Sequence, residues 1–279
     1  MKETFKKLSR AIKPLAAEHR ARSLDAYSAQ ASFFTFVSLV PLCALAFGVI
    51  KALPADLSGF YSAVVPALPP LLRAAVSQSF AAAELSPAAV VPVSAAITPF
   101  AASKGMYSVL RGVRSAYGLT GEGGIKLRLR SLAYTLVFVF MIIASFSLAV
   151  FGNTVERAFG AVIPGLAGTG AFRTVMRIGA SFAVIAVSHV LCYRFVPGAK
   201  APVSASLPGA LAASAVWLIA SAFYSFYAGW YACSSGSVYG GLAATVLLLL
   251  WLYSCMSATV TGGLINSLAA RKSGVIERK

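Results

Sequence analysis

Long apolar runs, separated by shorter polar or basic stretches, dominate the pattern of this 279-residue chain. The run at residues 240–266 contains no charged residue. It is longer than the roughly 20 apolar residues that a helix needs to cross a bilayer core about 30 Å thick. Within it, Ser254, Ser257 and Thr261 recur at helical spacing, as on a face turned toward other helices. The pattern therefore predicts a membrane-spanning helix within a bundle.

Similar runs along the whole chain predict an all-α fold, a polytopic membrane bundle of six transmembrane helices. Proline and charge interrupt residues 53–86, which predict an outer amphipathic helical segment instead of a span. The predicted organisation is a cytoplasmic basic amphipathic arm at 1–25, a membrane domain at 26–270 and a cytoplasmic tail at 271–279. The predicted spans are 29–50, 87–110, 131–151, 174–196, 207–229 and 240–266.

Charge sets the predicted orientation. Only 11% of the residues are charged, whereas a soluble domain has about 25%. The formal net charge is +16, and the basic residues concentrate in the N-terminal arm, after the second predicted span and at the C-terminus. The positive-inside rule then predicts a multi-pass protein with both termini in the cytoplasm. Because these charges lie between spans, and not in one basic domain, no nucleic-acid partner is expected.

The basic arm allows two interpretations. Leu8, Ile12 and Leu15 fall at helical spacing among its basic residues. This spacing is typical of a short amphipathic helix on an anionic cytoplasmic leaflet. The alternative is a solvated basic tail that only fixes the orientation of the chain.

The titratable residues give little support to catalysis. Metal-assisted phosphodiester hydrolysis needs clustered carboxylates or histidines. The eight acidic residues fall on both predicted sides of the membrane, and the only histidines are His19 and His189. We therefore predict no catalytic residue, no metal site, no cofactor and no enzymatic activity.

Cations near the inner ends of the predicted spans form the candidate binding site. Lys104 and Arg111 are seven residues apart, which places them on one face of a helix. Arginine pairs well with phosphate, so these cations suit an anionic membrane lipid, unless they only enforce topology. His189 is either a functional titratable group or a hydrogen-bonded packing residue. The predicted site members are Lys104, Arg111, Arg114, His189 and Arg194, of which the four cations are predicted to converge. The glycines predicted to mark close helix contacts are Gly240, Gly241, Gly262 and Gly263.

Short motifs follow one another in a fixed order along the chain: Ser38-Leu39 with Pro41, Ser103-Lys104-Gly105-Met106-Tyr107, Leu110-Arg111-Gly112, Ala116-Tyr117-Gly118, Tyr193-Arg194-Phe195 with Pro197, Pro208-Gly209-Ala210, Trp217, Tyr239-Gly240, Leu249-Leu250-Trp251-Leu252-Tyr253 and Asn266. Together they resemble the YihY/BrkB family of inner-membrane proteins, which carries the old label ribonuclease BN-like. The match extends over nearly all of the chain, and two positions depart from the family pattern, Leu264 and the pair Val113-Arg114. The resemblance implies a six-span protein of the bacterial inner membrane. Some members have been linked to serum resistance and others to envelope lipid export.

Two functions follow as hypotheses. The first is a transporter or flippase of an anionic lipid-like substrate, and the second is a non-catalytic scaffold that organises envelope partners. A cavity that contains Lys104, Arg111 or His189 would favour the first, and an apolar outer groove on a tightly packed bundle would favour the second. The sequence leaves open the substrate, the coupling ion and the oligomeric state.

Overall fold

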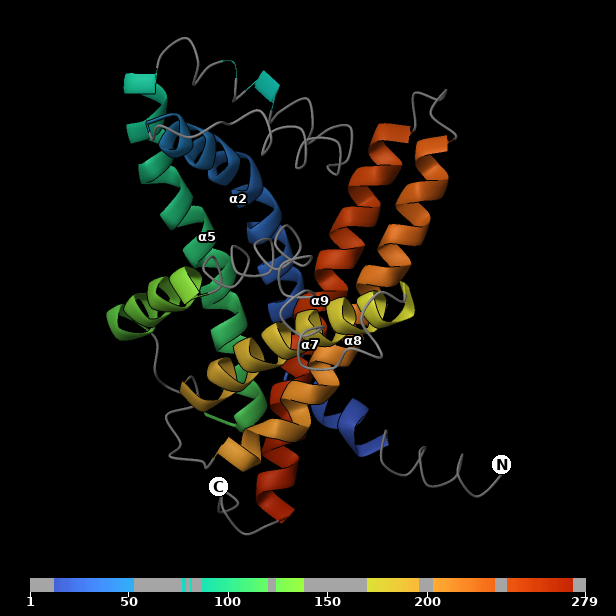
Figure 1. Cartoon of the computed structure of the whole chain (residues 1–279). Helices are drawn as coiled ribbons and strands as arrows, with labels where there is room; N and C mark the ends of the chain where they lie inside the picture. The colour runs from blue at the N-terminus through green and yellow to red at the C-terminus, as the bar shows by residue number, and fades with distance from the viewer. Residues whose placement is uncertain are drawn as a thin grey trace, which may run out of the picture. The chain divides into compact units, whose positions relative to one another are not determined.

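The computed structural model describes residues 13–52, 77–78, 81, 87–119, 124–137, 170–195, 203–233 and 240–272. Within these ranges the regular structure is α-helical and contains no strand (Figure 1). This confirms the predicted all-α fold class. The labelled helices are α2 (Leu24–Ala52), α5 (Pro87–Tyr117), α7 (Gly170–Phe195), α8 (Val203–Cys233) and α9 (Gly240–Lys272). Residues 13–21 and 125–137 are helical as well.

Three of the described helices are long and apolar enough to cross a membrane. They contain the segments Thr174–Arg194, Val203–Tyr227 and Thr245–Arg271, with mean hydropathies of 1.8, 1.7 and 1.5. These segments correspond to the last three predicted spans, so the chain is a membrane-type protein.

Helices α2 and α5 cover the first two predicted spans, and residues 125–137 cover the start of the third. The rest of the third span and most of the predicted outer segment at 53–86 lie outside the described residues. The count of six spans and the outer amphipathic segment therefore stay predictions.

The chain divides into two compact units. Helix α2 lies wholly in unit 2, whereas α5, α8 and α9 each contribute one part to either unit. Unit 1 consists of Met1–Arg22, Val113–Leu218 and Ala258–Lys279, and unit 2 consists of Ser23–Gly112 and Ile219–Ser257.

In unit 1, glycines allow the backbones of α8 and α9 to approach closely. A Cβ atom added to Gly209 would collide with the Gly262 carbonyl oxygen, and one added to Gly262 would collide with the Tyr193 hydroxyl. A Cβ atom added to Gly263 would lie 3.1 Å from the Val113 Cγ1 atom and 3.7 Å from the Tyr193 Cε1 atom. Small residues at helix contacts are what brings helices together in a bilayer, where lipid competes equally for apolar side chains.

Unit 2 is held by one tight helix contact and one apolar cluster. Helices α2 and α5 meet where a Cβ on Gly105 would lie 2.8 Å from the Thr35 Oγ1 atom. The buried residues Leu248 and Leu252 of α9 pack against partly buried side chains of α2, α8 and α9, which are Phe36, Leu39, Tyr224 and Trp251. The Trp251 indole donates a 3.2 Å hydrogen bond to the Ser221 hydroxyl, which joins α9 to α8 within this unit.

Candidate functional site

Two cations on one face of α5 are flanked by aromatic rings in unit 2. The Lys104 ammonium lies 5.2 Å from the ring centroid of Phe34 and 4.5 Å from that of Phe100. Seven residues further along, the Arg111 guanidinium lies 5.6 Å from the ring of Tyr27 and 5.9 Å from that of Tyr107. We call this strip of two cations and their four rings the cationic face.

The helical repeat explains why the cationic face forms. On α5, each cation follows an aromatic residue by four positions, so ring and charge meet on one side of the helix. On α2, Tyr27 and Phe34 are seven residues apart, which also places them on one side. The close contact at Gly105 allows the ring of Phe34 to reach Lys104.

Neither cation of this face forms an ion pair with a carboxylate among the described residues. Lys104 is half-buried and Arg111 is exposed. A ring attracts a cation through its quadrupole by about 0.5–2 kcal/mol, but it accepts no strong hydrogen bond. No carboxylate in the described part of the chain therefore competes with an anionic ligand for the N–H donors of these two groups.

An apolar groove of about 260 Å³ also lies in unit 2, between α2 and α9. None of Lys104, Arg111 and His189 lines it. Phe33, which lines the groove, packs edge-on against Phe34 with 5.5 Å between ring centroids, and Phe34 faces Lys104. The groove residues are Ala29, Ser32, Phe33, Val246, Leu249, Leu250 and Tyr253.

His189 lies in unit 1 within a polar network, and its side chain is buried. Its Nδ1 atom is 2.9 Å from the Ile185 carbonyl oxygen, which can only accept, so Nδ1 carries a proton. Its Nε2 atom lies 3.1 Å from the Thr259 hydroxyl, which in turn accepts a 3.2 Å bond from the Trp217 indole. Ser214 lies 3.2 Å from Nδ1.

A neutral imidazole satisfies both of its ring nitrogens in this network. Tyr193 strengthens the same contact, since its hydroxyl donates a 2.7 Å bond to the Thr259 carbonyl. The network thus joins α7, α8 and α9 within unit 1. His189 is thus a buried, hydrogen-bonded residue between three helices, as its packing interpretation requires. A role in transport stays a prediction.

A second buried hydrogen-bond network lies at the start of α8. Pro208 lies inside that helix and lacks a backbone N–H, which loosens the turn around it. Asn266 of α9 accepts a 2.6 Å bond from the Gly209 amide and donates a 3.1 Å bond to the Ser206 carbonyl. Burial raises the pKa of the neighbouring Tyr117 hydroxyl to about 12, against an opposing effect of the Asn266 side chain, so this phenol stays protonated at neutral pH.

The remaining predicted site residues have different surroundings. Helix α5 continues through both Arg111 and Arg114, but Arg111 is exposed whereas Arg114 is only 6% exposed, so the two do not share one open face. Arg194 is exposed at the end of α7. Lys104 and Arg111 lie together in unit 2, whereas Arg114, His189 and Arg194 belong to unit 1. The convergence of the four cations stays a prediction.

The predicted packing glycines fall into two pairs. Gly262 and Gly263 lie in the close contacts of α9 within unit 1. Gly240 and Gly241 begin α9, and only their backbone is described.

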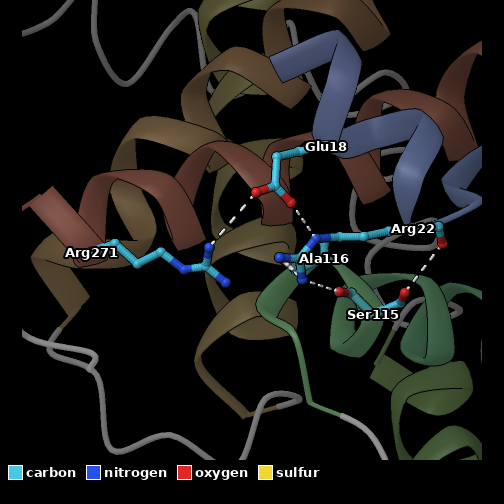
Figure 2. Close-up of polar contacts among 5 residues, drawn as sticks. All are labelled: Glu18, Arg22, Ser115, Ala116 and Arg271. Carbon is cyan, nitrogen blue, oxygen red and sulfur yellow. Dashed lines mark hydrogen bonds and ion pairs between the residues drawn. The ribbon is translucent and has the colours of Figure 1, made fainter. Parts of the chain in front are cut away.

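The sequence pattern does not reveal a polar cluster at the C-terminal end of α5 in unit 1 (Figure 2). The Arg22 guanidinium donates to the carbonyl oxygens of Ser115 at 2.7 Å and Ala116 at 3.3 Å. The Glu18 carboxylate pairs with Arg22 at 2.7 Å and with Arg271 at 3.9 Å. These residues come from the N-terminal arm, α5 and α9. Glu18 and Arg22 are four residues apart, but no spacing in the sequence links this pair to α5 or to Arg271.

Among the side chains that the structure describes, no group of three or more His, Cys, Asp or Glu residues could hold a metal ion. The chemistry present is therefore that of cations, hydroxyls and aromatic rings on apolar helices.

Long apolar helices, tied by buried hydrogen bonds and small-residue contacts, define an all-helical membrane protein. The chain belongs to the virulence factor BrkB family, which it matches over residues 16–279. This confirms the resemblance to the YihY/BrkB proteins. The family description names a virulence factor and no reaction.

The chain is also similar to a curated relative, the ribonuclease-like protein YfkH of Bacillus subtilis (strain 168). The two are 29% identical over 177 residues, which cover 62% of this chain and 63% of the relative. The match thus spans less than two thirds of that relative's length. No solved structure matches the chain significantly.

Proposed function

We propose that this protein resides in the bacterial inner membrane with both termini in the cytoplasm, and that it binds an anionic lipid and carries it as a transporter or flippase. The observation that supports this proposal is the cationic face of α5. There, Lys104 and Arg111 point along one side of the helix against aromatic rings, with no carboxylate partner among the described residues.

Phosphate is the ligand that suits these two cations. Charge-assisted hydrogen bonds to phosphate are roughly twice as strong as neutral ones, and an arginine can form two of them in parallel. Water is scarce at a half-buried lysine near lipid, so the attraction is less screened there than at an open surface. The flanking rings hold both side chains in place and leave their N–H groups unused.

The apolar groove supplies a complementary surface for an acyl chain. It is lined almost entirely by apolar side chains, and Phe33 and Phe34 connect it to the surroundings of Lys104. A lipid with its phosphate at the cationic face and a chain in this groove would use both features of unit 2.

Neutralising the cationic face should weaken the retention of anionic lipid. In native mass spectrometry of detergent-purified protein, we expect Lys104→Gln combined with Arg111→Gln to lower phosphatidylglycerol binding by about tenfold or more, because two charge-assisted contacts are lost. Phosphatidylethanolamine, which is zwitterionic, should change less. Lys126→Gln, which removes an exposed charge in unit 1, is the matched control and should bind as the wild type does.

Equal lipid retention by the double variant and the control, with both folded, would contradict this function. The cations would then only set the topology of the chain.

The apolar groove also favours a second candidate, the membrane scaffold. None of the candidate site cations lines the groove, so it could receive an apolar helix of an envelope partner in place of a lipid chain. Transport assays distinguish the two functions, because a scaffold binds its partner without moving lipid. Ribonuclease activity, which the name of the B. subtilis relative suggests, is not included in the proposal.

A further inference from the structure

Two guanidinium groups meet beside the end of α5 in unit 1, on either side of one carboxylate (Figure 2). Arg22 and Arg271 both approach Gly118: a Cβ atom added to this glycine would lie 3.1 Å from the Arg22 Nη1 atom and 3.4 Å from the Arg271 Nη2 atom. The cluster carries two positive charges against the single negative charge of Glu18. Its side chains are only partly exposed, at 18% for Arg22, 25% for Arg271 and 35% for Glu18.

The end of α5 is already capped without Arg271. The Leu119 amide donates to the Arg114 carbonyl at 3.0 Å and the Gly118 amide donates to the Ser115 carbonyl at 2.9 Å. Together with the positive φ of 76° at Gly118, these bonds form the Schellman end of a helix. Arg22 covers the carbonyls of Ser115 and Ala116. Capping of α5 therefore explains the position of Arg22, but Arg271 takes no part in this cap.

Glu18 holds Arg271 less closely than it holds Arg22. In the described part of the chain, its one ion pair is the long 3.9 Å contact with Glu18, whereas Glu18 holds Arg22 at 2.7 Å. A guanidinium carries five N–H donors in a planar fork. The carboxylate of Glu18 thus bridges the two arginines, closely through Oε2 to Arg22 and loosely through Oε1 to Arg271.

We propose that Arg22 and Arg271 form a phosphate-binding site at the end of α5, with Glu18 as the internal group that partly fills it. A phosphate group matches the guanidinium fork. Inorganic phosphate also carries more negative charge and more acceptor oxygens than the carboxylate, whereas a lipid phosphodiester equals it in charge. Gly118 contributes by its missing side chain, which leaves room for both guanidinium groups beside the backbone. The site is separate from the cationic face of α5, because it lies wholly in unit 1.

Either a lipid headgroup or free phosphate could supply this group, and the two sources can be separated. We would measure binding to the full-length protein in neutral nanodiscs in two ways. Phosphatidylglycerol is added to the bilayer in one series, and inorganic phosphate is added to the solution in the other. Binding in the first series alone identifies a headgroup site, and binding in the second identifies a site for soluble phosphate.

Two conservative variants should shift this binding in opposite directions. Arg271→Gln is expected to weaken it by about tenfold, since a charge-assisted contact is lost. Glu18→Gln keeps an oxygen acceptor for Arg22 but removes the competing charge, and it should tighten binding by about fivefold at this partly exposed position. Lys126→Gln again serves as the control for a lost surface charge.

The proposal is overturned if Arg271→Gln binds as the control does, or if Glu18→Gln weakens binding. In the second case Glu18 would be holding the arginines and not competing for them. Arg22→Gln is a poorer test because it also removes the α5 cap. The same variants should also be measured in a protein that carries Lys104→Gln, which weakens the cationic face. If the two sites are separate, Arg271→Gln should still weaken binding and Glu18→Gln should still tighten it.

Discussion

Replacing Gly209 with alanine is expected to lower the free energy of unfolding by about 3 kcal/mol, the upper part of the range for overpacking. The added methyl group would collide with the Gly262 carbonyl oxygen and would lie 2.7 Å from Cγ and Nδ2 of Asn266. Neither neighbour can move easily, because one is helix backbone and the other is a buried side chain held by two hydrogen bonds. Helices α8 and α9 would have to separate locally.

Gly179→Ala is the matched control, because a Cβ at this glycine of α7 meets no atom within 4 Å. It should leave stability unchanged or raise it slightly through the better helix propensity of alanine. Thermal unfolding of both variants in the same detergent, followed by tryptophan fluorescence, makes the comparison. If both variants unfold at the same temperature as the wild type, α8 and α9 do not approach as closely as described.

Asn266→Leu is the second substitution with a large expected effect, about 3 kcal/mol of destabilisation from unsatisfied buried groups. Leucine has a similar size but offers no partner to the Gly209 amide or the Ser206 carbonyl. Water cannot easily replace the lost bonds, since Asn266 is fully buried. The turn of α8 at Pro208 should therefore loosen, which hydrogen exchange of the amides around residues 204–210 would report.

Ser257→Ala, on the same helix but half-buried, gives the comparison for removing a polar side chain there. We expect a change within about 0.5 kcal/mol for such a substitution. An Asn266→Leu protein with the stability and exchange rates of Ser257→Ala would show that the two hydrogen bonds of Asn266 do not stabilise the start of α8.

Apolar run length was sufficient to predict the helices, since each of α7, α8 and α9 coincides with a predicted span to within a few residues at its start. The hydrogen bonds between helices were harder to predict. The spacing of Ser254, Ser257 and Thr261 suggested a face toward other helices, yet the Ser254 hydroxyl bonds to the Leu250 carbonyl of its own helix. Thr259, Asn266 and Trp251 of the same helix form bonds to other helices. A hydroxyl in an apolar helix can satisfy itself locally, so spacing alone does not show which one reaches across.

The candidate sites, too, could be predicted only in part. Lys104 and Arg111 were predictable as a pair, because seven residues of helix fix their common face. Their aromatic partners on α2 depend on the contact at Gly105, which only the fold reveals. The pairing of Glu18 with Arg271 joins the two ends of the chain, and no local pattern encodes such a contact.

Lipid movement in reconstituted vesicles tests the proposed function most directly. The protein is placed in liposomes that carry a fluorescent phosphatidylglycerol, and a membrane-impermeant quencher reports how quickly the label crosses the bilayer. We predict that the wild type accelerates the crossing of this anionic lipid more than that of labelled phosphatidylcholine. Lys104→Gln with Arg111→Gln should abolish most of the acceleration, whereas Lys126→Gln should keep it. If the wild type leaves the crossing rate at that of protein-free vesicles while it still retains anionic lipid, the protein is not a flippase, and the scaffold function would replace it.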